Sequence, residues 1–125
     1  RVVCVERINA RELEVNDARV PDVALGFDLV VGDLSFISLT LVLPALLPLL
    51  KSGGALLMLV KPQFELQPSD IGKGGLVKDE ASYVQVEARL REACVALNLE
   101  VLGYWPSAIA GGDGNKEFWI GARRA

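Results

Sequence analysis

The sequence contains 125 residues, 51% hydrophobic and 23% charged, which supplies enough apolar surface for the core of one globular domain and excludes a disordered or collagen-like chain. It contains no histidine, so Ser-His-Asp triads, histidine general bases and histidine metal sites are excluded. The net charge of −3 argues against binding nucleic acid through a bulk positive field, while a local basic patch stays open.

The two cysteines, Cys4 and Cys94, lie far apart within apolar runs and predict neither a zinc cluster nor a disulfide framework. We expect no metal site and a reducing, cytoplasmic compartment. No apolar run is long enough to span a bilayer, so we expect a soluble protein without a membrane partner. The chain starts at Arg1 without an initiator Met and passes straight into a strand-like run, so we expect a fragment of a longer protein.

The first elements in chain order are two short strands. Residues 1–5 are rich in β-forming side chains, and a polar stretch over 6–16 predicts a loop with a short helical turn. Residues 27–33 predict the second strand, whose last residue is an acid, Asp33.

An apolar helix and an apolar strand follow. Ser38 is a suitable N-cap for a helix over 39–50, and the pair Gly53-Gly54 is expected to turn the chain into a strand over 55–60. Lys51 is the only charge between positions 34 and 60, so both elements should be deeply buried.

The second half of the chain begins with a long connection, 62–78, which is rich in Gly, Pro and charge and is expected to be irregular. Asp79 is a good N-cap for an amphipathic helix, whose apolar positions recur at three- and four-residue steps: Tyr83, Val86, Leu90, Cys94 and Leu97. Two closing strands, 99–105 and 116–122, are joined by a short loop and should be antiparallel neighbours.

These elements predict an α/β fold with an open, mostly parallel sheet that ends in an antiparallel strand pair. Continuous apolar strands are typical of a parallel sheet covered on both faces. The ligand crevice of such a fold lies beyond the carboxyl ends of the parallel strands. We expect one domain.

Two charged residues, Asp33 and Lys61, stand at the carboxyl ends of apolar strands and should face this crevice. The alternative is that strands simply end in solvated polar residues. Pro62 restricts the chain directly after Lys61, so the lysine should be held extended at the strand exit. Because histidine is absent, a lysine is the natural base, and Glu117 is a second acid that could reach the crevice unless it only faces solvent.

The segment Gly72-Lys73-Gly74-Gly75 is only superficially similar to a phosphate loop, because Gly follows the Gly-Lys pair where Ser or Thr is required. We therefore reject a nucleoside triphosphatase. Lys73 and Lys78 could instead form a flexible basic clamp on a phosphate backbone, and the alternative is a solvated surface loop.

Five blocks of sequence together resemble one protein family. The blocks cover residues 3–11, 32–39 (Gly-Asp-Leu-Ser-Phe-Ile-Ser-Leu), 60–65 (Val-Lys-Pro-Gln-Phe-Glu), 72–77 and 111–118. In this order they resemble the TlyA, or hemolysin A-like, branch of the FtsJ-type ribose 2′-O-methyltransferases. The resemblance extends over nearly the whole chain.

The resemblance implies a Rossmann-like fold that binds S-adenosylmethionine and methylates cytidine ribose in ribosomal RNA, within ribosomes or their subunits. The family uses a Lys-Asp-Lys-Glu tetrad, and Asp33, Lys61 and Glu117 match its last three members. Lys61 would then deprotonate or orient the 2′-hydroxyl, while Asp33 and Glu117 set its charge and position. Asn9 and Ala10 match the segment that lies against the cofactor adenine, and Asp33 would also border the cofactor.

The resemblance also implies that the family's S4 RNA-binding domain, glycine-rich cofactor loop and first tetrad lysine precede this segment. We therefore expect residues 1–125 to be the carboxyl-terminal portion of a methyltransferase domain, with its first strands missing and with impaired cofactor binding on its own. An incomplete sheet would leave an exposed edge, so homo-oligomers through that edge are expected.

Two other functions stay open. The chain could be a non-catalytic, methyltransferase-like RNA-binding or assembly module. A membrane-active hemolysin is disfavoured, because no spanning or basic amphipathic helix is predicted.

Overall fold

The computed structural model describes residues 26–33, 37–108 and 114–125; the strand and turn expected over residues 1–16 lie outside this part. The described helices and strands are, in chain order, β1 (Phe27–Gly32), α1 (Leu39–Leu46), β2 (Leu50–Val60), α2 (Ala81–Ala96), β3 (Leu99–Pro106) and β4 (Phe118–Arg124).

The strands form one mixed sheet in the order β1-β2-β4-β3. Strands β1 and β2 are parallel, whereas β4 lies antiparallel between β2 and β3. The predicted α/β class and the antiparallel closing pair are therefore confirmed. The parallel part consists of one strand pair within the described residues.

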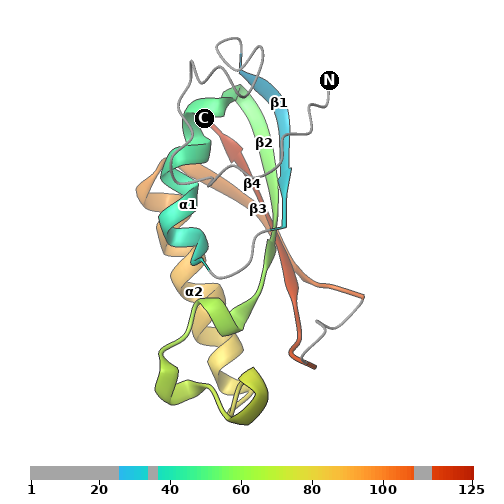
Figure 1. The fold of residues 1–125 in the computed structure, drawn as a ribbon. Coiled ribbons are helices and arrows are strands. Elements are labelled where there is room, and N and C mark those ends of the chain that lie inside the picture. The colour runs from blue at the N-terminus through green and yellow to red at the C-terminus, as the bar shows by residue number, and fades with distance from the viewer. Residues whose placement is uncertain (1–25, 34–36, 109–113) are drawn as a thin grey trace.

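The core lies between the sheet and the two helices, which cover the same face of the sheet (Figure 1). Alternate residues of β2 point into it, because side chains of a strand alternate between its faces: Leu56, Met58 and Val60 are buried. Helix α1 contributes residues at helical spacing, Leu39, Val42, Leu43 and Leu46, as expected for an amphipathic helix.

The other sheet face differs from the expectation of two covered faces. Both described helices lie on one side (Figure 1), and several large apolar side chains of the outer strands β1 and β3 stay exposed. Leu29 and Val31 of β1 are 54% and 58% exposed, and Trp105 of β3 is 46% exposed.

The predicted helix over 39–50 is too long. Helix α1 ends at Leu46, and the chain continues as a 3-10 turn over Leu47–Leu49. The reason is Pro48, which has no amide hydrogen to continue the α-helical bonding and disfavours helical geometry at the residue before it. Ser38 caps α1 as predicted, because its hydroxyl accepts a hydrogen bond from the amide of Thr40.

The predicted turn at Gly53-Gly54 is also wrong. Strand β2 already begins at Leu50 and contains both glycines, at a register shift between the pairs Phe27–Leu50 and Leu29–Ala55. Gly53 has a φ of +79°, and a Cβ on Gly54 would lie 2.8 Å from the carbonyl oxygen of Phe27. The glycines thus form a bulge where two backbones approach closely, instead of a turn.

The long connection after β2 is more ordered than predicted. It contains 3-10 turns over Pro62–Phe64, Pro68–Asp70 and Lys73–Gly75, and a β-bridge joins Ile71 to Val77. Helix α2 starts at Ala81, where the Asp79 carboxylate accepts a hydrogen bond from the first helical amide. Within the described part of the chain, no helix has the length and hydropathy needed to cross a membrane.

Candidate functional site

The carboxyl ends of the parallel strands bring Asp33 and Lys61 together. Asp33 follows β1, Lys61 follows β2, and the lysine Nζ lies 2.5 Å from Asp33 Oδ1. The Lys61 side chain is only 15% exposed, whereas that of Asp33 is 60% exposed. The two strand-end charges selected from the sequence thus form a contact pair, with a largely buried lysine side chain and an aspartate side chain that solvent can reach.

The backbone around Lys61 is fixed by the residues that follow it. Lys61 is extended, with φ −111° and ψ 98°, as the adjacent proline predicts. Pro62 is buried and starts the 3-10 turn, in which the amide of Phe64 donates to the Lys61 carbonyl at 3.0 Å. The lysine therefore leaves the strand in one defined direction.

Glu117 directly precedes β4, and β4 flanks β2 on the side opposite β1. Val60 pairs with Phe118 in the antiparallel ladder, so extending this register by one residue puts Glu117 opposite Lys61. The carbonyl of Glu117 accepts a hydrogen bond from the amide of Ser107 at 2.7 Å, which holds it beside the end of β3. The sheet topology thus gathers the three sequence-predicted catalytic residues at one edge.

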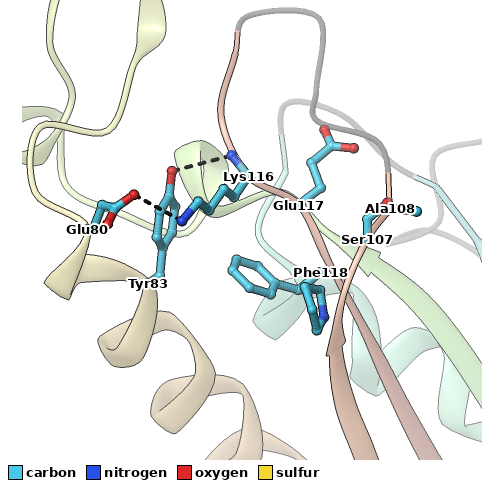
Figure 2. A pocket seen from close by; sticks show the side chains of 8 residues that line it. Glu80, Tyr83, Ser107, Ala108, Lys116, Glu117 and Phe118 are labelled. Carbon is cyan, nitrogen blue, oxygen red and sulfur yellow. Dashed lines mark hydrogen bonds and ion pairs between the residues drawn. The ribbon is translucent and has the colours of Figure 1, made fainter.

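A pocket of about 490 Å³ opens beside Glu117, between the first turn of α2 and the ends of β3 and β4. Its lining residues are Glu80, Tyr83, Pro106, Ser107, Ala108, Lys116, Glu117 and Phe118. Figure 2 shows Lys116 extending toward Glu80 and Tyr83, while the Glu117 side chain points away from them. This is the alternation expected of consecutive strand residues.

Lys116 closes one side of this pocket. Its Nζ lies 3.0 Å from Glu80 Oε1, and its amide donates to the Tyr83 hydroxyl at 3.3 Å. The hydrogen bond and charge of Glu80 raise the pKa of Lys116. Tyr83 in turn meets Phe118 edge-on, with ring centroids 5.6 Å apart. The pocket thus has an aromatic wall and a charged rim.

The loop that carries Lys73 and Lys78 is attached to the strand that follows Asn115. Asn115 is 1% exposed; its Oδ1 accepts from the amide of Val77 at 2.9 Å and its Nδ2 donates to the carbonyl of Gly75 at 2.7 Å. Both lysines are exposed. The segment for which the sequence left a flexible clamp and a solvated surface loop open is therefore a hydrogen-bonded loop with exposed lysines, and sequence analysis overlooked the asparagine that attaches it.

Glu65 is a second residue that the sequence analysis missed. It is 5% exposed, and its carboxylate accepts from the Ser38 hydroxyl at 2.5 Å and from the Leu39 amide at 2.7 Å. Burial raises the pKa of Glu65, against the lowering effect of these two hydrogen bonds and of Arg89. The only signal in the sequence was its place at the end of the block 60–65.

The residues expected to border a cofactor are only partly described. Asn9 and Ala10 lie outside the described residues. Asp33 lies where a cofactor of an α/β fold is expected, at the carboxyl end of a parallel strand, and its exposed carboxylate suits a cationic ligand. The described part of the site thus offers one solvent-accessible carboxylate, itself paired with Lys61, at the position where a cofactor is expected.

Comparisons with known proteins identify similar sequences and similar folds. A family model described as FtsJ-like methyltransferase matches residues 1–124. The 16S/23S rRNA (cytidine-2′-O)-methyltransferase TlyA of Mycobacterium tuberculosis is 38% identical, over 98% of this chain and 44% of its own length.

Two solved structures are similar in fold. A hemolysin-like protein from Lactococcus lactis superposes with a TM-score of 0.85 at 30% identity, over all of this chain and 58% of that one. A SAM-dependent methyltransferase from Methanosarcina mazei gives a TM-score of 0.57 at 17% identity, over 94% of this chain and 65% of that one, which shows a shared fold alone. The chain thus spans less than half the length of the curated relative and little more than half of the hemolysin-like structure.

Proposed function

Since this chain belongs to the FtsJ-like methyltransferase family, in its TlyA/hemolysin A branch, we propose that its protein transfers a methyl group from S-adenosylmethionine to a ribose 2′-hydroxyl of ribosomal RNA, at a cytidine. The observation that carries this proposal is the Asp33–Lys61 pair at the carboxyl ends of the parallel strands. S-adenosylmethionine would supply the methyl group on its sulfonium. Asp33, together with Asn9 and Ala10, would hold it.

Lys61 would act on the hydroxyl that accepts the methyl group. A 2′-hydroxyl is a weak nucleophile, and the transfer depends on aligning its oxygen with the methyl group. Two roles are compatible with the position of the amine. As an ammonium it would donate a hydrogen bond and orient the oxygen, and as a neutral amine it would accept the hydroxyl proton.

Asp33 and Glu117 would set the position and charge of this amine. Asp33 holds the amine from one side at 2.5 Å, and the register of the sheet brings Glu117 to the strand on the other side. A pH–rate profile separates the two roles of Lys61, because proton acceptance requires the neutral amine and orientation requires the charged one.

The RNA would contact the surface next to this edge. Lys73 and Lys78 are exposed on the loop that Asn115 attaches, and lysines in such a position contact phosphate groups without reading sequence. The pocket beside Glu117 would border the same RNA segment. With a net charge of −3, such local contacts are the form of RNA binding that the chain supports.

The test is methyl transfer from labelled S-adenosylmethionine to ribosomal subunits, using the complete product of the gene. The Lys61→Ala variant should lose activity by about 100-fold or more. The matched control is Lys51→Ala, because Lys51 forms a second Lys–Asp pair, at 3.6 Å from Asp28, at the opposite end of the same strands. Equal activities of the two variants would refute the assignment of Lys61, and an inactive wild type would favour the non-catalytic RNA-binding module.

A further inference from the structure

We propose that Glu65 is a positioning residue, whose carboxylate joins the exit of β2 to the start of α1 and thereby holds Lys61 against Asp33. The inference deepens the proposed function and rests on it for its effect on the reaction. Among the described residues, Glu65 contacts neither the amine of Lys61 nor the carboxylate of Asp33, so its effect on them is indirect.

The first link connects Glu65 to Lys61 through one rigid turn. The amide of Phe64 donates to the Lys61 carbonyl at 3.0 Å, and the amide of Glu65 donates to the Pro62 carbonyl at 2.9 Å. Pro62 is buried and fixes its own φ. A displacement of Glu65 is therefore transmitted to the backbone of Lys61.

The second link connects Glu65 to the segment that follows Asp33. Its two carboxylate oxygens accept from the Ser38 hydroxyl and from the Leu39 amide, across 27 and 26 residues of sequence. Ser38 and Leu39 begin α1, five and six residues after Asp33. The carboxylate thus fixes the start of α1, which is the next described helix or strand after β1.

A third contact fixes Glu65 from the side of α2. The Arg89 guanidinium donates a hydrogen bond to the main-chain carbonyl of Glu65. The turn after β2 is thereby joined to both helices at one buried residue.

The first test measures the accessibility of the Lys61 amine and does not require catalysis. The complete gene product is acetylated with an N-hydroxysuccinimide ester, and mass spectrometry gives the rate at Lys61 relative to Lys51. Because Lys61 is 15% exposed and Lys51 is 48% exposed, the ratio should be low in the wild type. Glu65→Ala should raise the ratio about fivefold or more, as expected when a buried contact network is opened.

The control for general destabilisation is Leu99→Ala. Leu99 begins β3 and is 2% exposed. It pairs with Arg124 at the end of β4, whereas Lys61 lies next to the start of β4, so the two residues are at opposite ends of the strands. Truncation of Leu99 lowers the melting temperature but should leave the labelling ratio unchanged. An unchanged ratio in Glu65→Ala, or an equal rise in Leu99→Ala, would overturn the inference whether or not the protein is a methyltransferase.

The second test separates positioning from binding. Glu65→Ala should lower kcat about tenfold or more while the KM for RNA stays within about twofold, because a misplaced group costs rate without removing a substrate contact. Glu65→Gln should restore most of kcat, since its amide oxygen still accepts from Leu39 and its amide nitrogen can donate to Ser38.

A double variant completes the test. If Glu65 acts through Lys61, Lys61→Ala combined with Glu65→Ala should be no slower than Lys61→Ala alone. Additive losses would contradict this route. Inactivity of the wild type refutes the proposed function instead, and the labelling ratio still decides whether Glu65 positions Lys61.

Discussion

Replacing Asn115 by Ala should release the basic loop from the sheet without unfolding the core. The substitution removes two hydrogen bonds from a side chain that is 1% exposed and leaves the Val77 amide and the Gly75 carbonyl without this partner. Each orphaned backbone group costs about 1–2 kcal/mol, so the loop should lose about 2–4 kcal/mol of local stability. The loop keeps its internal bonds, such as that from the Gly72 amide to the Leu76 carbonyl.

The assay is amide hydrogen exchange of the peptide that spans residues 70–78. A loss of 2–4 kcal/mol corresponds to exchange faster by about 30-fold to several hundred-fold, because each 1.4 kcal/mol is a factor of ten. The control is Asn98→Gly, which removes an exposed amide at a residue with φ +59°, where glycine is well tolerated. Unchanged exchange in Asn115→Ala, or an equal increase in Asn98→Gly, would refute the reasoning.

Three further predictions follow from the site and the sheet. Burial raises the pKa of Glu65 above 4.5, so the folded state binds this proton more tightly than the unfolded state. The free energy of unfolding of the wild type, relative to that of Glu65→Gln, should therefore rise as the pH falls from 7 toward 4.5. Denaturation curves that give the same difference between the two proteins at both pH values would contradict this. The isolated 125-residue chain should self-associate through its exposed Leu29, Val31 and Trp105. Light scattering should report oligomers for the wild type and fewer oligomers for Trp105→Ser. A wild-type chain that is entirely monomeric would refute this prediction. Calorimetry should find that S-adenosylmethionine binds the isolated chain at least about tenfold more weakly than the complete gene product, and equal affinities would show that these residues hold the whole cofactor site.

The parts of the fold that depend on local pattern were predictable from the sequence. The apolar periodicity of Val86, Leu90 and Cys94 correctly predicted the buried face of α2, and Ser38 correctly predicted the start of α1. The meeting of Asp33 and Lys61 was also predictable, because it follows from a topological rule: residues at the carboxyl ends of adjacent parallel strands share an edge.

The parts that depend on long-range contacts were not predictable in this way. Gly53 and Gly54 have the composition of a turn, and only the approach of β1 turns them into a bulge within β2. Glu65 and Asn115 look like solvated loop residues, because charged and amide side chains usually are. Their partners lie 26–40 residues away in the chain, and no local periodicity encodes such a distance.

Four of the five blocks that carry the family resemblance, those that lie at least partly in the described residues, form a connected set of contacts in the folded chain. The blocks at 32–39 and 60–65 are joined twice, by the Asp33–Lys61 ion pair and by the bonds of Glu65 to the start of α1. The blocks at 72–77 and 111–118 are joined by the side chain of Asn115. The pairing of Val60 with Phe118 then links the two halves across the sheet. A motif residue such as Glu65 or Asn115 therefore need not touch a substrate to matter, because it fixes where the residues proposed to act on that substrate stand.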